Sequence, residues 1–299
     1  MTTSHTNVGE SQVPAKMALT ELAAMKRQGS RIAMVTAYDA AGGRLAEAAG
    51  VDVVLVGDSA AMVVLGHEST VPVTMDEMLM MTRAVASAVR RPLVVGDMPF
   101  GSYQVSDAEA VHNAVRFIKE GRADTVKLEG AGRMLPRVRA IVESGIPVMG
   151  HLGLTPQSAT ALGGYKAQGR TAARARRMLD DALALQEAGC YSIVLEAVPT
   201  PVAARITEAL EIPTIGIGAG PACDGQVLVY HDLLGLTEGH TARFVKRYAD
   251  LATVIRDALA AYVADVRSGA YPEERHTYGM PADERAAFEA DQPDSRRST

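Results

Sequence analysis

Tryptophan is absent from this 299-residue sequence, phenylalanine occurs four times and cysteine twice. So few aromatic rings leave little for nucleic-acid bases to stack on, and the net charge of −5 is spread without basic blocks that would bind phosphates. No nucleic-acid partner is therefore expected. Cys190 and Cys223 do not form a CxxC pair. This excludes a disulfide framework and a cysteine zinc site, and it indicates a reducing compartment, the cytoplasm.

Long hydrophobic runs are missing as well. No stretch of about 18 apolar residues occurs, so no membrane-spanning helix and no membrane partner are expected. The start of the chain lacks the basic and apolar regions of a secretory signal. What the sequence does contain is 47% hydrophobic residues, which is enough to bury a large core.

Short β-branched runs alternate with longer segments of helical spacing. The short runs are almost continuously hydrophobic, as strands buried on both faces are. The sequence predicts eight strands, at Ile32–Thr36, Val51–Val56, Leu93–Gly96, Thr125–Leu128, Pro147–Gly150, Ile193–Leu195, Pro213–Ile217 and Val227–Tyr230. It predicts helices at Ala40–Ala49, Met75–Val89, Asp107–Lys119, Arg133–Glu143, Ala172–Ala188 and Val202–Leu210.

This alternation over roughly 250 residues is typical of an α/β fold, a single (β/α)₈ TIM barrel. An open doubly wound sheet usually carries GxGxxG after its first strand, whereas here Thr36-Ala-Tyr-Asp39 follows. We therefore expect a frayed N-terminus at residues 1–16, a catalytic barrel with a C-terminal helix at 17–282, and a polar tail at 283–299.

Two extra helices are expected outside the repeat. Met17–Arg27 reads as a short helix that closes the bottom of the barrel. Apolar residues recur every three or four positions from Phe244 to Val266, which predicts one long helix. Its apolar stripe could pack on the barrel or form a subunit contact. His67, His231 and His240 are interpreted as structural.

Charged residues stand where the strands end, and in a TIM barrel those ends form the open face that carries the chemistry. Asp58, Asp97 and Glu129 follow three different strands, and Glu196 follows a fourth. One such Asp often caps a helix, but clustered carboxylates repel one another unless a cation lies between them.

Oxygen ligands without cysteine or HxxxH spacing suit Mg²⁺, so Asp58, Asp97 and Glu129 are its predicted ligands, directly or through water. Lys127 lies two residues before Glu129 and faces the same way, toward a substrate carboxylate or as an ion-pair partner. Glu196 is then free to act as a general base, and His151 after the fifth strand is a candidate hydrogen-bond donor to substrate. The pattern indicates metal-assisted enolisation or C–C bond chemistry and goes no further.

Several long motifs, in order over residues 17–280, resemble the 3-methyl-2-oxobutanoate hydroxymethyltransferase (ketopantoate hydroxymethyltransferase) family. They are VTAYD, LVGDS, GHEST-VPVT, DMPFGSYQ, VKLEG, GHLGLTPQS, GGYKAQGR, LEAVP and IPTIGIGAG-ACDGQVLV. The resemblance implies a barrel of the phosphoenolpyruvate mutase/isocitrate lyase type with Mg²⁺. It also implies transfer of a one-carbon unit from 5,10-methylenetetrahydrofolate to 3-methyl-2-oxobutanoate, giving 2-dehydropantoate in pantothenate biosynthesis.

The same resemblance implies that the metal motifs contain Asp58, Asp97 and Glu129. It implies that the 2-oxo acid is contacted by Asp58, Ser59, Asp97 and Lys127. It also implies that Glu196 is the proton acceptor. The family is typically a homodecamer, a pentamer of dimers. Two other classes stay open. A lyase of the same barrel group usually carries a cysteine- or asparagine-bearing loop where this chain has GGYKAQGR. A binding or scaffold protein would have lost a carboxylate or the lysine.

Overall fold

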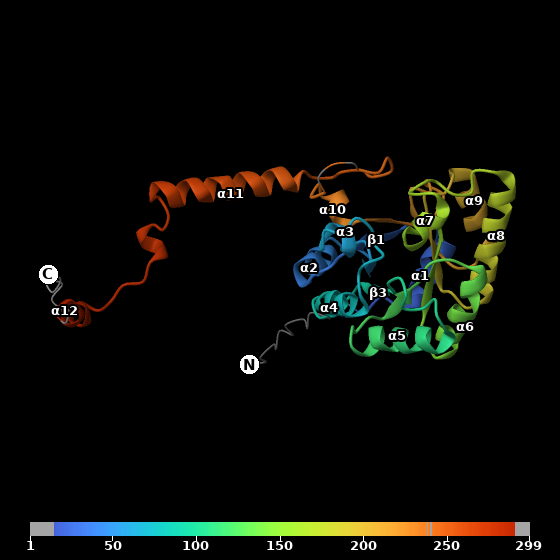
Figure 1. Ribbon diagram of the computed structural model, residues 1–299, viewed down its shortest axis with the longest axis horizontal. Coiled ribbons are helices and arrows are strands. Elements are labelled where there is room, and N and C mark those ends of the chain that lie inside the picture. The colour runs from blue at the N-terminus through green and yellow to red at the C-terminus, as the bar shows by residue number, and fades with distance from the viewer. Residues whose placement is uncertain (1–14, 238, 240, 291–299) are drawn as a thin grey trace, which may run out of the picture. The chain divides into compact units, whose positions relative to one another are not determined.

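Eight parallel strands close into a barrel in the computed structural model, which describes residues 15–237, 239 and 241–290 (Figure 1). The strands pair in sequence order, and β8 closes on β1. They are β1 Ile32–Thr36, β2 Val53–Val56, β3 Leu93–Asp97, β4 Thr125–Lys127, β5 Val148–Gly153, β6 Ser192–Glu196, β7 Thr214–Ile217 and β8 Gly225–Leu228. The predicted TIM barrel is thus confirmed.

Helices follow most of the strands and lie outside the barrel (Figure 1). They are α1 Leu19–Gln28, α2 Ala40–Ala48, α3 Ala60–Val63, α4 Met75–Ala86, α5 Asp107–Lys119, α6 Leu135–Glu143, α7 Ala159–Leu162, α8 Ala172–Glu187, α9 Thr200–Ala209 and α10 Tyr230–Leu233. Short 3₁₀ turns η1 Gly132–Met134 and η2 Pro156–Ser158 precede α6 and α7. None of the described helices combines the length and apolarity needed to cross a bilayer.

The strand residues separate into two cores because successive side chains face opposite ways. Val53 and Leu55 of β2 belong to the cluster inside the barrel, whereas Val54 and Val56 belong to the cluster beneath the helices. Met17 and Leu22 join the inner cluster. The N-terminal helix therefore supplies apolar side chains to the barrel interior, as expected for a helix that closes one end.

Most strand and helix boundaries differ slightly from the sequence-based expectation, and two of these differences have a clear physical reason. The last strand begins at Gly225 rather than Val227, since Gly225 pairs with both Ile32 and Ile215 and leaves no space for a side chain there. The C-terminal helix does not start near Phe244. Residues before Leu251 are irregular because Phe244 packs on Gly218 and the N–H of Tyr248 donates to the carbonyl of Leu233 (2.8 Å).

The described chain forms two compact units, one ending at Ala249 and one beginning at Asp250. The second unit contains α11 Leu251–Ser268, η3 Glu274–His276 and α12 Ala282–Ala290. Helix α12 corrects the expectation of an irregular polar tail. Its Ala, Glu and Arg residues favour helix, and Arg285 pairs with Glu289 one turn later (2.7 Å). Residues 1–14 and 291–299 of the two predicted tails lie outside the described residues.

Candidate active site

The carboxyl ends of the strands surround a cavity of about 1330 Å³. Every residue that the sequence assigned to a site lines it: Asp58, Ser59, Asp97, Lys127, Glu129, His151 and Glu196. His67 and His231, interpreted from sequence as structural, line the cavity too, and His240 lies outside the described residues. The predicted residues thus meet at one place.

Lys127 and Asp97 form a buried ion pair. Their side chains come from paired positions on β4 and β3, and Nζ of Lys127 lies 2.6 Å from Oδ1 of Asp97. Burial disfavours the ammonium, but the negative charges of Asp97, Glu129 and Asp58 outweigh it and raise the pKa of Lys127. Lys127 is therefore a permanent cation at the base of the cavity.

Asp58 follows β2, and its backbone N–H donates to Oδ2 of Asp97 (3.1 Å). Burial, and then the charges of Asp97 and Glu129, raise the pKa of the Asp58 carboxyl well above its usual value. Burial is also the main cause that raises the pKa of Asp97. Three carboxylates thus repel one another across this cavity, and a single lysine does not balance them.

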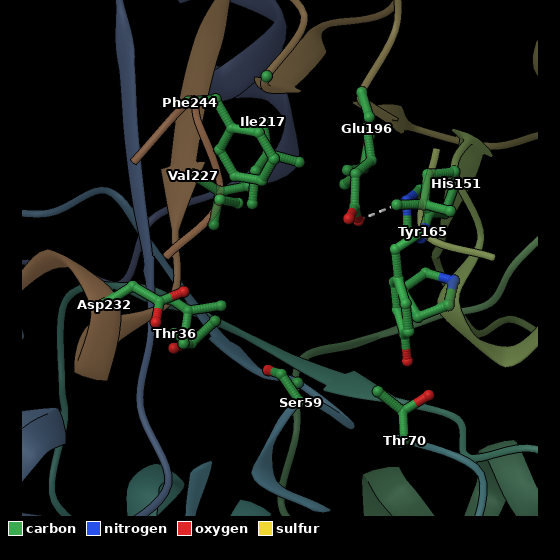
Figure 2. Close-up of a pocket in the computed structure, with 18 of the residues that line it drawn as sticks. Thr36, Ser59, Thr70, His151, Tyr165, Glu196, Ile217, Val227, Asp232 and Phe244 are labelled. Atoms are coloured by element: carbon green, nitrogen blue, oxygen red, sulfur yellow. Dashed lines mark ion pairs between the residues drawn. The ribbon is translucent and has the colours of Figure 1, made fainter. Parts of the chain in front are cut away.

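His151 on β5 lies between two carboxylates. Its Nδ1 is 3.3 Å from Oε1 of Glu129, and its Nε2 is 3.3 Å from Oε2 of Glu196 (Figure 2). Burial and Lys127 disfavour the imidazolium, but both glutamates favour it and the net effect raises the pKa of His151 to about 9. At neutral pH the histidine is therefore a cation that orients Glu196 at the cavity wall.

The backbone around Glu196 is unusual. Ala197 adopts φ 49, a left-handed conformation that costs a non-glycine residue about 1 kcal/mol, and its N–H donates to the carbonyl of Ile217 (2.8 Å). On the paired strand, Gly153 has φ +97 and faces the Glu196 carbonyl, which leaves no room for a side chain. These two residues fix where β6 ends and so where the Glu196 carboxylate enters the cavity.

Gly153→Ala should destabilise the chain by more than about 1 kcal/mol and impair Glu196, because the new methyl would collide with the Glu196 carbonyl and lie 2.7 Å from Cγ2 of Val198. Urea unfolding measures the loss. Gly145→Ala is the control, since Gly145 has φ +90 with open space around it. Equal losses in the two variants would contradict the steric argument.

A metal ion fits the acidic side of the cavity when water or substrate oxygens complete its coordination. Oδ1 of Asp97 and Oε1 of Glu129 are buried, and each faces one basic side chain, Lys127 at 2.6 Å and His151 at 3.3 Å. Yet no three His, Cys, Asp or Glu side chains in the described part of the chain are close enough together to hold an ion by themselves. Mg²⁺ commonly takes one or two carboxylates and completes its shell with water and substrate oxygens, and this donor set suits it.

Ser59 and the opposite wall complete the cavity. Oγ of Ser59 lies 2.8 Å from Oη of Tyr38, which also accepts from Thr36 (2.9 Å). Figure 2 shows Ile217, Val227 and Phe244 across the cavity from Glu196 and His151. Tyr165, Lys166 and Arg170 of the long segment after β5 line the cavity as well.

Sequence reasoning missed Gln157 and Tyr103, two buried residues beside the carboxylates. Oε1 of Gln157 accepts from Oη of Tyr103 (2.6 Å), and its Nε2 donates to Oδ2 of Asp58 (2.9 Å). Both residues stand inside motifs of the family resemblance, TPQS and GSYQ, and that position was their only sequence signal.

The fold defines the class: it is a closed barrel of eight parallel strands, and solved barrels of the same architecture align with it. The solved structure of 2,3-dimethylmalate lyase, a member of the phosphoenolpyruvate mutase/isocitrate lyase superfamily, aligns with a TM-score of 0.57 at 15% identity, covering 93% of this chain and 99% of the lyase. Phosphonopyruvate hydrolase aligns with the same TM-score and identity over 91% of this chain and 95% of its own. At such identity these likenesses show the fold alone.

The chain belongs to the ketopantoate hydroxymethyltransferase family, whose model matches residues 16–274. The 3-methyl-2-oxobutanoate hydroxymethyltransferase of Moorella thermoacetica is 58% identical over 264 residues, 88% of this chain and 98% of that one. That of Acidothermus cellulolyticus is 56% identical over 266 residues, 89% of this chain and 98% of that one. The predicted family is confirmed, and the chain is a transferase enzyme.

Proposed function

We propose that this enzyme transfers a hydroxymethyl group from 5,10-methylenetetrahydrofolate to 3-methyl-2-oxobutanoate, giving 2-dehydropantoate by enolisation at C3. The observation that carries this proposal is the pairing of a positioned carboxylate, Glu196, with a buried lysine and three further carboxylates in one cavity. Membership of the hydroxymethyltransferase family supports it.

Asp58 and Asp97 are the residues proposed to hold Mg²⁺, with Glu129 behind them through water. A solved structure of phosphonopyruvate hydrolase, which shares the fold at 16% identity and a TM-score of 0.55, holds oxalate and Mg²⁺. When bound, the ion supplies Lewis acidity that makes the C3 proton of a 2-oxo acid easier to remove. Its charge also offsets the repulsion among the three carboxylates.

The protein residues then have separate tasks. Lys127 and Ser59 bind the 2-oxo acid, and Lys127 balances the negative charge that develops when the C3 proton leaves. The Glu196 carboxylate accepts that proton, with His151 holding it in place. C3 bonds to the one-carbon unit of the folate, water supplies the hydroxyl, and tetrahydrofolate leaves.

The folate ring is proposed to bind on the opposite wall. Ile217, Val227 and Phe244 give this wall an apolar surface that faces Glu196 (Figure 2). A fused aromatic-like ring buries its faces well against such side chains, while Asp232 and Thr36 beside them can accept its N–H groups. The cavity therefore offers space for a second substrate next to the acidic side.

A direct test incubates the enzyme with 3-methyl-2-oxobutanoate, 5,10-methylenetetrahydrofolate and Mg²⁺ and looks for 2-dehydropantoate. Product that needs both the folate and the metal, and that disappears with a chelator, supports the proposal. Cleavage of a four-carbon 2-oxo acid or related diacid without folate would instead favour the lyase. An enzyme that binds both substrates and turns over neither would favour a binding protein.

We further propose that the chain acts in the cytoplasm as a homodecamer. Both cysteines are buried free thiols, as a reducing compartment permits. Helix α11 carries an exposed apolar stripe that another copy of the chain can cover, comprising Val254, Leu259, Tyr262 and Val266.

Leu259→Glu should lower the molar mass of the assembly, because a charge on the stripe disfavours burial in a subunit interface. Size-exclusion chromatography with light scattering measures the mass. Asp257→Ala, on the other face of α11, should leave it unchanged. An unchanged decamer in Leu259→Glu would remove this stripe from the interface.

A further inference from the structure

Gln157 donates hydrogen bonds to two of the carboxylates proposed to hold the metal, to Asp58 through its side chain and to Glu129 through its backbone N–H. It lies in η2, shortly after β5 ends at Gly153, and the N–H of Leu154 donates to the Glu196 carbonyl (2.8 Å). Its side chain is 5% exposed. Its own backbone N–H donates to Oε2 of Glu129 (3.1 Å), while its side chain reaches Asp58.

The amide of Gln157 has all of its hydrogen bonds satisfied. Nε2 donates to Oδ2 of Asp58 and to the carbonyl of Met98, each at 2.9 Å. Both partners are acceptors, so the reversed amide would place oxygen against oxygen, and only one orientation is stable. Oε1 accepts from Tyr103 at 2.6 Å, which fixes the other end.

Tyr103 extends these bonds into a directed chain. The backbone N–H of Glu129 donates to Oη of Tyr103 (3.2 Å), Tyr103 donates to Gln157, and Gln157 donates to Asp58. Each donor strengthens the next, and every group in the chain is buried. One oxygen of Asp58 and one of Glu129 are thus held by Gln157. Oδ1 of Asp58 is left for a cation, whereas Oε1 of Glu129 lies 3.3 Å from Nδ1 of His151.

We propose that Gln157 is a positioning residue for the divalent cation: its side chain fixes Asp58 so that Oδ1 stays available to the metal, and its backbone N–H holds Glu129 beside it. This inference rests on the proposed function for the identity of the metal. An uncharged donor suits the task because it holds both carboxylates without neutralising the charge that attracts Mg²⁺. A second lysine here would compete with the ion.

Gln157→Ala should weaken Mg²⁺ binding by about 10- to 100-fold, as the loss of residues that orient metal ligands commonly does. Titration calorimetry with Mg²⁺ alone measures the affinity without any turnover. Tyr103→Phe removes only the hydroxyl that holds Oε1 of Gln157, so its loss of Mg²⁺ affinity should be smaller than that of Gln157→Ala. If Gln157→Ala does not fold, the Tyr103→Phe titration decides the question.

Gln186→Ala is the matched control. Gln186 also uses its amide to accept two backbone N–H groups, from Glu211 (2.7 Å) and Ile212 (3.2 Å), but outside the cavity. Its loss should lower the melting temperature and leave the Mg²⁺ affinity unchanged.

Affinity within twofold of wild type in Gln157→Ala, or no Mg²⁺ binding by the wild type, would overturn the proposal. Normal Mg²⁺ binding that depends on Gln157, without folate-dependent product, would leave Gln157 in its role and reject the proposed reaction instead.

Discussion

Glu196→Gln should reduce deuterium exchange at C3 of 3-methyl-2-oxobutanoate by about 10²- to 10⁴-fold at saturating Mg²⁺. The amide keeps the size of the side chain and can still face His151, whose Nε2 lies 3.3 Å from the carboxylate. It cannot accept a proton at neutral pH. Solvent-deuterium exchange followed by NMR isolates this step because it needs no folate.

Glu129→Gln is the comparison variant, which distinguishes loss of a general base from loss of a negative charge. Glu129 contacts the other nitrogen of the same histidine, also at 3.3 Å, so both variants remove a carboxylate beside His151. The Glu129 variant should need more Mg²⁺ and then recover much of its exchange, whereas the Glu196 variant should not recover. Exchange at the wild-type rate in Glu196→Gln would exclude Glu196 as the base.

The barrel could be predicted from sequence because its signals are local and repeated. A strand buried on both faces needs a continuous apolar run. Both β2 and β3 have such a run, which stops shortly before Asp58 in the first case and Asp97 in the second. Alternation placed Lys127 and Glu129 on one side, and both side chains line the cavity. Residues at strand ends could therefore be assigned to a common site without knowing any distance.

The hydrogen bonds of Gln157 could not be predicted in this way. They join Gln157 to Tyr103, 54 positions away in the sequence, and to Asp58, 99 positions away. No periodic pattern in the sequence encodes contacts of this kind. The prediction of helix around Phe244 was wrong for a related reason. The apolar spacing there continues the spacing of α11, but the ring of Phe244 packs on Gly218. In both cases contacts distant in sequence decided the structure, where local spacing had indicated something else or nothing.

Lys127→Met should destabilise the metal-free protein by about 3–5 kcal/mol at pH 8, because it leaves Asp97 buried without its counter-ion. The loss should be smaller at pH 5. Asp58 and Asp97 already have raised pKa values in the folded state, mainly through burial, and removing the ammonium raises them further. The unfolded carboxyls release their protons near pH 4 while the folded ones retain them, so stability falls as the pH rises above 4.

Urea unfolding at both pH values, with and without Mg²⁺, tests this expectation. Lys26→Met is the control: Lys26 pairs with Asp224 at 2.8 Å outside the cavity, and Asp224 keeps its bonds from the N–H and hydroxyl of Thr214. Its loss should be about 1 kcal/mol and should not respond to the metal. Added Mg²⁺ should restore part of the stability of Lys127→Met only, since a divalent cation near Asp58 and Asp97 replaces the missing positive charge. A loss in Lys127→Met that is the same at both pH values and unaffected by Mg²⁺ would mean that the carboxylates of this cavity are not coupled through Lys127.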